Sequence, residues 1–448
     1  MDVNLARRMR AFVGAAALAA AALWAGASFA DTSAPSDEEY SFHGQLTVVN
    51  QYHPAFRSPY RGTNSLDPGS RGDETVTATL SAGFRLWEGG QIYFDPEVDQ
   101  GFGLSNTTGL AAFPNGQGSK VGSSTPYFRL QQVFFRQEID LGTDPRWVDS
   151  SPNQLGMAQS DENIIITLGK FPTTAVFDTN AYAHDPSSDF LNWTLITSGA
   201  YDYAADAWGY TYGTSVEWTE GWWTLRGGFF ALSRVPNGRD LQTDFTQFEV
   251  VGEAEARQDF FGREGKIKFL AFVNRGNMGS YDDAVRLGAL TNAIPDTGLV
   301  RKYRSRPGFA LNIEQPVTDD LGAFLRASFN NGTLETYEFT DTNRSTAVGL
   351  SLQGTAWGRH DDTFAVAAVV NAISDSARSY FAAGGLGVLI GDGQLPHYGT
   401  ENVIETYYSA NVTDWLRATA DYQFALHPAY NKDRGPVSIF GLRVRASF

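Results

Sequence analysis

The sequence contains no cysteine among its 448 residues. This absence excludes a disulfide framework and thiolate metal sites. The six histidines show no metal-ligand spacing, and no HExxH, GxSxG or phosphate-loop motif occurs. Beyond residue 30, no apolar run approaches the length of about 18 residues that a spanning helix requires. We therefore expect no enzyme activity, no cofactor and no helical membrane protein.

Positive charge is also scarce. Lysine and arginine number 34 against 50 aspartates and glutamates, which gives a net charge of -16 and a pI of about 4.8. Because binding to nucleic acid phosphates requires a basic face, nucleic acid is not an expected partner. Aromatic residues make up 13% of the chain, and glycine occurs 46 times. This composition favours strands and tight turns over helices.

Residues 1–30 have the three parts of a secretory signal peptide. The positive region contains Arg7, Arg8 and Arg10, and the apolar region spans 11–27. The small residues Ser28 and Ala30 precede the cleavage site. Cleavage is predicted after Ala30, and a retained membrane helix is the alternative. Residues 31–41 are polar and acidic, which predicts a flexible segment. The remaining residues, 42–448, are predicted to form one domain.

The last dozen residues show the pattern that defines this domain. Phe440, Leu442 and Val444 alternate with Arg443 and Arg445. Successive side chains of a strand point to opposite faces, so this strand has one apolar face and one cationic face. A lipid-facing arginine would cost roughly 2–4 kcal/mol near the bilayer midplane, so we expect the arginines to face water.

The same alternation recurs along the chain, with an apparent change of phase near Gln131 that predicts a bulge. About sixteen segments show it by pattern. They lie near 42–52, 75–87, 90–99, 127–141, 163–171, 207–217, 222–232, 245–258, 265–275, 303–315, 320–332, 344–354, 361–373, 401–411, 414–426 and 436–448.

The connections between these segments are short and long in turn, and only 142–162 breaks the rule. Short periplasmic turns and long outer loops are typical of outer-membrane barrels. The sequence therefore predicts an all-β protein, a 16-stranded antiparallel transmembrane β-barrel in the bacterial outer membrane. A soluble, exported β protein is the alternative.

The third long connection, 172–206, is rich in aromatic and apolar residues. Long ordered loops are usually functional. We expect this one to fold into the barrel as a constriction, and a packed lid outside the mouth is the alternative.

If the alternation holds, charges of both signs face the lumen. The predicted set is Arg226, Glu249, Arg304, Arg306, Arg326, Arg417, Asp421, Arg443 and Arg445. A mixed lining suits a neutral, hydroxyl-rich solute such as a sugar, which needs donors, acceptors and flat aromatic faces. Possible faces are Trp87, Tyr93, Trp193, Trp208 and Trp222, while Trp218, Trp223 and Trp415 are expected in an interfacial girdle. The alternative is that the charges pair with one another around a wide, unselective hole.

Several stretches resemble the carbohydrate-selective porins of the OprB type. Those with the clearest likeness are SPYRGTNSL at 58–66, DPEVDQGFGLSNTTG at 95–109, YAHDPSSDFLNW at 182–193, KYRSRPG at 302–308 and PAYNKDRGPVSIFG at 428–441. The resemblance covers nearly the whole chain after the signal peptide. It implies a sixteen-stranded outer-membrane barrel that passes glucose-like sugars through a constricted eyelet.

Arg85, Glu97 and Arg129 fall in stretches that match the family's eyelet residues. The predicted eyelet combines them with aromatic and loop residues, namely Tyr93, His184, Asp185, Trp193 and Trp208. Family members often carry an arginine after the His-Asp-Pro of the third loop, where this chain has Ser187 and Ser188. That difference implies an eyelet that is wider or less cationic.

The predicted function is passive, selective diffusion of carbohydrates into the periplasm, with small sugars and outer-membrane lipid as the partners. A general diffusion porin without a specific sugar site is the main alternative. A plugged barrel that binds a partner, and a barrel enzyme, are the others. Porins of this size adopt either a monomeric or a trimeric state, and the sequence leaves both open, as it does the preferred sugar and the role of 142–162.

Overall fold

A computed structural model describes residues 36–118, 122–260, 262–339 and 341–448. The predicted signal peptide lies outside the described residues. Residues 38–448 form one compact unit. Across the described ranges, no helix combines the length and the apolar character needed to cross a membrane.

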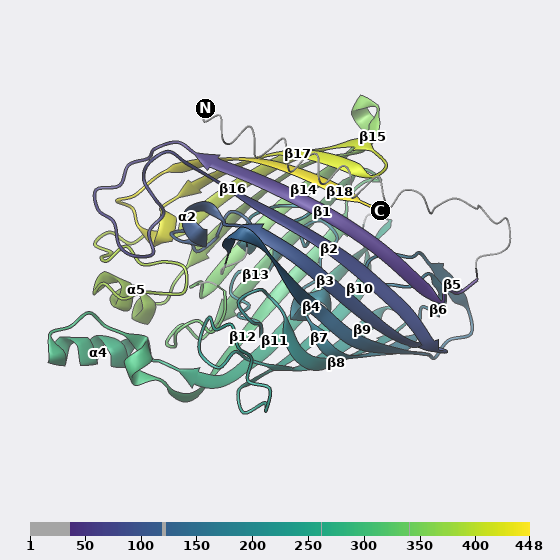
Figure 1. The fold of residues 1–448 in the computed structure, drawn as a ribbon, viewed down its shortest axis with the longest axis horizontal. Coiled ribbons are helices and arrows are strands. Elements are labelled where there is room, and N and C mark those ends of the chain that lie inside the picture. The colour runs from purple at the N-terminus through teal and green to yellow at the C-terminus, as the bar shows by residue number, and fades with distance from the viewer. Residues whose placement is uncertain (1–35, 119–121, 261, 340) are drawn as a thin grey trace. The chain divides into compact units, whose positions relative to one another are not determined.

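Within the described chain, sixteen strands form a closed barrel (Figure 1). They are β1 (Tyr40–His53), β2 (Arg71–Trp87), β3 (Gly90–Gly101), β4 (Ser123–Asp140), β7 (Asn163–Phe171), β8 (Thr211–Glu220), β9 (Trp223–Ala231), β10 (Phe248–Phe260), β11 (Arg263–Met278), β12 (Lys302–Pro316), β13 (Leu321–Asn330), β14 (Arg344–Gly354), β15 (Arg359–Ala372), β16 (Glu401–Thr413), β17 (Leu416–Leu426) and β18 (Val437–Ser447). All sixteen predicted segments are confirmed as these strands.

Each barrel strand pairs antiparallel with the next barrel strand along the chain, and β1 pairs with β18 to close the barrel. In the closing pair, Val48 lies opposite Val444. Closure removes free sheet edges, so each strand has a hydrogen-bonded neighbour on both sides, as the bilayer interior requires. The up-and-down topology predicted from the loop lengths is therefore correct.

The helices of the described residues are short and lie in the connections. They are α2 (Leu104–Thr107), α3 (Trp193–Ile196), α4 (Tyr281–Thr291) and α5 (Asp375–Ala382), with single 3-10 turns at η2 (Thr173–Ala175), η3 (Thr297–Val300), η4 (Thr355–Trp357) and η5 (Pro428–Tyr430). Helix α4 begins where the Ser280 side chain accepts from the Asp283 amide, and it ends at left-handed Asn292. In Figure 1, α4 and α5 lie at one end of the barrel, the end with the long connections.

The unexplained stretch 142–162 contains a separate hairpin at the other end of the barrel (Figure 1). It consists of β5 (Pro145–Val148) and β6 (Met157–Ser160), paired so that Val148 lies opposite Met157. The connection is long because it carries its own two-stranded structure between β4 and β7.

The alternation in β18 separates two environments, as predicted. Phe440 and Leu442 are each 51% exposed on the outer surface, whereas Arg443, the residue after Leu442, is 1% exposed. The outer face of the barrel carries many such exposed apolar side chains, among them Leu80, Phe84, Val250, Phe309 and Ile404. On a barrel in a bilayer, this face contacts lipid rather than water.

Two local expectations can be compared directly with the strands. The pairing of β3 with β4 skips one residue, because Asp95 lies opposite Gln132 and Pro96 lies opposite Leu130. The predicted bulge at Gln131 is therefore confirmed. Residues 31–35 of the predicted flexible segment 31–41 lie outside the described residues, and at its other end Glu38 hydrogen-bonds with Gly156 and β1 begins at Tyr40.

Tryptophans gather at the short-turn end of the barrel. Trp218 lies edge-to-face with Trp223, with ring centroids 5.1 Å apart. Trp415 is exposed at the turn before β17. Trp87 and Trp222, suggested above as aromatic faces for a solute, are also exposed at short turns. Their positions suit an interfacial girdle, where an aromatic ring meets both lipid and water.

We expect Leu442→Arg to lower the free energy of unfolding of the barrel by about 2–4 kcal/mol, because Leu442 lies at the middle of β18 on its outer face. Urea unfolding of the barrel in lipid vesicles measures the change. The control Leu442→Met should cost less than about 1.5 kcal/mol. Equal stability of the two variants would contradict the assignment of this face to lipid.

Candidate functional site

The third long connection, 172–210, makes ion pairs with the barrel wall through three aspartates. Asp178 pairs with Arg326 of β13 at 3.3 Å, and Asp202 pairs with Arg306 of β12. Asp206 lies 3.2 Å from Lys170 of β7 and 3.6 Å from Arg129 of β4. The Asp178–Arg326 and Asp202–Arg306 pairs are almost fully buried. Removing one partner of such a pair leaves a buried charge uncompensated, so the pairs hold the segment to strands on several sides of the barrel.

Wall carboxylates accept hydrogen bonds from backbone amides of the same segment. Glu253 of β10 accepts from Asp178 at 2.8 Å, and Glu314 of β12 accepts from Ala181 at 2.9 Å. Glu405 of β16 accepts from the amides of Leu191 and Asn192 at 2.5 and 2.9 Å. These amides belong to irregular backbone, which must find partners wherever water is excluded.

Arg443 of β18 binds the carbonyl oxygens of the same segment instead of its amides. Its guanidinium donates to the carbonyl oxygens of Pro186, Ser188 and Asp189 at 2.6–2.8 Å. A planar guanidinium suits this role because it presents five donors in a fixed plane. The turn that contains Ser187 and Ser188 is therefore held by the wall of β18.

The interior retains a cavity of about 560 Å³ beside this segment. Its walls come from β1–β4 on one side and from the long connections on the other. Six of the predicted site residues line it, namely Glu97, His184, Asp185, Trp193, Trp208 and Arg445. The structure thus brings together residues that lie up to 348 positions apart in the sequence, from Glu97 to Arg445.

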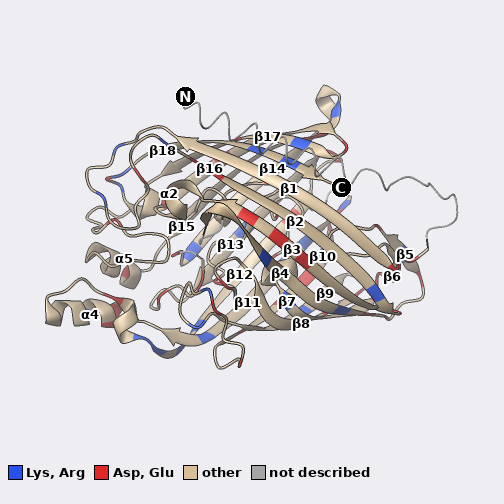
Figure 2. Cartoon of the chain, in the orientation of Figure 1, with Lys and Arg blue, Asp and Glu red and all other residues tan. Residues whose placement is uncertain are grey.

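Strand β3 supplies a row of carboxylates to this cavity. Asp95, Glu97 and Asp99 all line it, and acidic positions recur along β3 (Figure 2). Glu97 accepts from the Thr79 hydroxyl at 2.6 Å and from the Gln131 amide at 3.2 Å. The bulge at Gln131 places this amide among the carboxylates, since it adds an inward-facing side chain to β4.

Aromatic rings form another part of the cavity wall. Trp193 stacks on Phe113 with centroids 4.8 Å apart, and it also packs against Phe339 and Tyr203. The indole of Trp208 carries the Arg129 guanidinium over its face at 3.3 Å and donates to the Tyr127 hydroxyl. Arg129 is therefore behind Trp208, held by a cation–π contact as well as by Asp206.

His184 and Asp185 occupy the loop side of the cavity. Asp185 accepts from the amide and the hydroxyl of Ser187 at 2.8 and 2.7 Å. Burial opposes ionisation of this carboxyl, but Arg445 and the Ser187 hydrogen bonds outweigh burial and lower the pKa of Asp185. Burial lowers the pKa of His184, so its imidazole is neutral at pH 7. The pair offers a carboxylate and a neutral ring to the cavity.

Two predicted eyelet residues lie elsewhere. Arg85 is six residues along β2 from Thr79, the partner of Glu97, which corresponds to about 20 Å of strand. Its Nε donates to the carbonyl oxygen of Glu38 at the short-turn end. Tyr93 is fully buried, stacks on Phe134 at 5.0 Å and hydrogen-bonds with the Leu155 amide, so its ring is covered.

The other predicted lumen charges lie on the inner side of the barrel, but most contact protein. Arg226 pairs with Glu217, Glu253 and Glu255 within the wall. Arg304 binds Asp283 of α4, near the end with the long connections. Glu249 accepts from the Tyr201 hydroxyl, and Asp421 accepts from Gln423.

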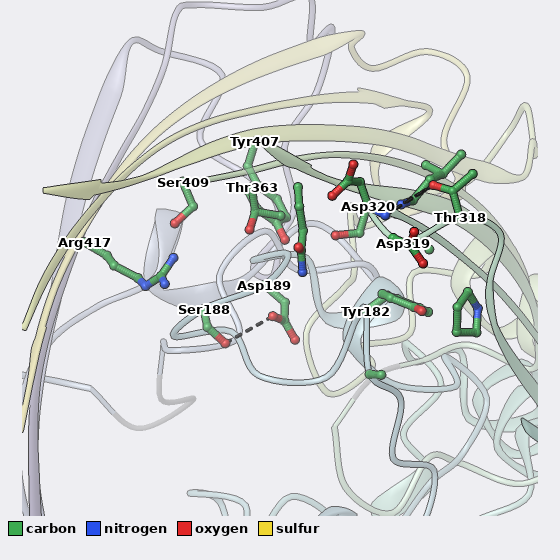
Figure 3. Close-up of a pocket in the computed structure, with 16 residues that line it drawn as sticks. Tyr182, Ser188, Asp189, Thr318, Asp319, Asp320, Thr363, Tyr407, Ser409 and Arg417 are labelled. Atoms are coloured by element: carbon green, nitrogen blue, oxygen red, sulfur yellow. Dashed lines mark hydrogen bonds between the residues drawn. The ribbon is translucent and has the colours of Figure 1, made fainter. Parts of the chain in front are cut away.

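Arg417 lines a second cavity of about 270 Å³ (Figure 3). Figure 3 shows Tyr407 and Ser409 of the wall facing Ser188 and Asp189 of the third long connection. The turn between β12 and β13 contributes Thr318, Asp319 and Asp320, so this cavity lies toward the short-turn end.

Several lining residues were missed by the sequence analysis. Phe113, Asn153, Tyr203 and Phe339 belong to connections without alternation, so nothing in their neighbourhood indicates which way they point. In the described part of the chain, no group of three or more histidine, aspartate or glutamate side chains is arranged to hold a metal ion.

Comparison with known proteins agrees with the barrel fold. Residues 63–448 match the family described as carbohydrate-selective porin, OprB family. The chain is 22% identical over 305 residues to porin AaxA of Chlamydia abortus, a match that covers 66% of this chain and 57% of that porin.

Solved structures show the same fold. The high-pH structure of Pseudomonas putida OprB is 17% identical, covers 92% of this chain and 94% of its own, and superposes with a TM-score of 0.68. The outer membrane channel DcaP of Acinetobacter baumannii is 10% identical, with coverage of 94% and 100% and a TM-score of 0.52. With its closed sixteen-stranded outer-membrane barrel, this chain belongs to the OprB family of carbohydrate-selective porins.

Proposed function

We propose that the protein is a passive outer-membrane channel that selects carbohydrates, with glucose-like sugars as its substrates. The observation that carries the proposal is the cavity beside β3, whose lining contains both hydrogen-bonding groups and aromatic rings. A sugar presents hydroxyls around its edge and apolar C–H surfaces on its faces. A site with both kinds of partner discriminates such a solute from a simple ion or an apolar molecule.

The eyelet in this proposal is the space between β3 and the third long connection. Glu97 and Asp185 accept hydrogen bonds from sugar hydroxyls, and Arg445 donates to them. Trp193 and Trp208 offer their rings to the C–H faces. Each contact replaces a hydrogen bond with water, so net binding stays weak enough for release. Flux follows the concentration gradient.

The third long connection sets the width of the channel in this mechanism. Its three aspartates and the wall cations fix it inside the barrel, so the constriction is rigid rather than a loose flap. Burial of the Asp178–Arg326 pair at about 1% exposure on both sides supports this role. Arg306, Arg326 and Arg443 of the wall thus hold the third long connection in place, and this connection narrows the path of the solute.

We expect glucose to reduce ion conductance through single channels in planar bilayers, with the block saturating as the sugar concentration rises. A bound sugar occupies the cavity and displaces the ions that would pass through it. The control is the same salt solution brought to equal osmolarity and viscosity with a solute too large to enter the channel. A channel whose conductance is unaffected by glucose at any concentration would be a general diffusion porin.

Glu97→Gln should weaken the glucose block by about ten-fold, because hydrogen bonds to charged groups contribute about 1.5–3 kcal/mol. The measurement is the glucose concentration that halves the conductance. Glu74→Gln is the matched control, since Glu74 is exposed on the outward face of β2. An equal effect of both variants would show that the site near β3 does not bind the sugar.

Arg326→Gln should raise the single-channel conductance and weaken the glucose block together. The change leaves Asp178 buried without its charged partner, at a local cost of about 3–5 kcal/mol, which favours release of the loop from the wall. Arg344→Gln is the control, because Arg344 is exposed at the start of β14. Wild-type conductance in the Arg326 variant would contradict the role of the loop as the constriction.

A further inference from the structure

The segment between β5 and β6, residues 149–156, reaches into the barrel from the short-turn end. Its tip is a tight turn in which the backbones of Ser151 and Gln154 exchange two hydrogen bonds of 2.9 Å. Pro152 and Asn153 form the corner, and both line the 560 Å³ cavity. Asn153 has a left-handed backbone with φ of 62°, which asparagine and glycine adopt more readily than other residues.

The tip is bonded to the inner wall of β2, β3 and β4. The side-chain amide of Asn153 donates to Asp95 at 2.8 Å, and the backbone N–H of Asn153 donates to the Ser81 hydroxyl at 3.1 Å. Arg136 donates to the Asn153 carbonyl oxygen at 2.7 Å. Leu155, which is fully buried, donates its backbone N–H to the Tyr93 hydroxyl at 3.1 Å.

The base of the segment is bonded to the residues that precede β1. The Glu38 carboxylate accepts from the Ser150 hydroxyl at 2.7 Å and from the Gly156 amide at 2.8 Å. Arg85 donates to the Glu38 carbonyl oxygen at 3.0 Å. Two predicted eyelet residues, Arg85 and Tyr93, therefore contact this segment or its anchor instead of the cavity.

The depth of the tip follows from the strand it touches. Ser81 lies six residues before the end of β2 at Trp87, or about 20 Å along the strand. With strands tilted by roughly 40°, this corresponds to about 15 Å along the barrel axis. The tip therefore lies well inside the barrel, on the periplasmic side of the row of carboxylates on β3.

We propose that residues 149–156 form a second constriction, in series with the one made by the third long connection, and that Asn153 is a specificity-determining residue there. Its carboxamide donates to Asp95 and accepts from the Ser81 hydroxyl, which leaves one N–H and one oxygen lone pair for the hydroxyls of a solute. The segment is a fixed part of the channel, since its tip and its base are both bonded to the barrel. The inference rests on the channel function proposed above, but not on its selectivity for sugars.

A shortened hairpin tests this proposal. Replacing 149–156 by Asn-Gly joins Val148 to Met157, which already lie opposite each other, through a two-residue turn that fits a hairpin. In salt alone, single-channel conductance should rise by about two-fold or more, as expected when a hydrated constriction is removed. In liposome swelling, a disaccharide should enter faster relative to glucose than it does through the wild-type channel.

Asn153→Gly is the milder variant. Glycine keeps the left-handed turn but removes the carboxamide from the cavity, so conductance should rise less than in the shortened hairpin, and the disaccharide-to-glucose ratio should rise with it. Arg146→Ala is the control on the same hairpin, because the Arg146 side chain is 79% exposed and forms an ion pair with Asp161, whose side chain is also exposed. It should behave as the wild type.

Heat-modifiable migration on gels shows whether each variant forms the barrel, and if the shortened hairpin does not fold, Asn153→Gly decides. Wild-type conductance and wild-type solute ratios in the folded variants would overturn the proposal. A wild-type channel that glucose never blocks, but whose conductance responds to Asn153→Gly, would refute the sugar site and leave the second constriction standing.

Discussion

The interior of this barrel depends on the match between charged side chains of the wall and polar groups of the connections that enter it. Arg306 and Arg326 meet aspartates, Glu405 meets backbone amides, and Arg443 meets carbonyl oxygens. Buried irregular backbone is tolerated only where each N–H and C=O has a partner. The wall supplies those partners, and so the connections can be ordered where a regular sheet would leave an open hole.

Because of this match, several charged side chains that face the lumen are bound to the connections instead of being free to contact a solute. A barrel of this size with free charges on its wall would be a wide, mixed-charge pore. Here Arg306, Arg326 and Arg443 bind the third long connection, and Arg226 pairs with carboxylates of the wall. The cavity that remains is lined mainly by acceptors of β3, aromatic rings and the single arginine at 445. In the proposed mechanism, selectivity arises from the groups that the loops leave uncovered, and the two proposed constrictions act on the same space from opposite ends.

The short-turn end also contributes more than girdle residues and tight turns. Glu38 joins the start of the barrel to the base of the 149–156 segment, and Asn153 joins its tip to β2 and β3. A connection between two neighbouring strands thus becomes part of the solute path. The ordering of Glu38 and Glu39 ahead of β1 has the same physical origin, since Arg85 and Gly156 bind their backbone.

The sequence by itself determined the barrel: strand alternation such as that of Phe440 to Arg445, the bulge at Gln131 and the order of short and long connections each follow from local rules of strand geometry and of contact with lipid. The inner or outer facing of Arg85, Arg306 and Arg443 was determined in the same way. Only the tertiary structure decided which inward side chains meet a loop and which meet the cavity. Arg85 and Glu97 share one face of the sheet, yet a distance of six residues along β2 and the entry of 149–156 separate their roles. Alternation indicates which side of the sheet a residue faces. The path of an irregular connection depends instead on partners far away in the sequence, such as Asp178 and Arg326, which are 148 positions apart, and no local pattern encodes that pairing.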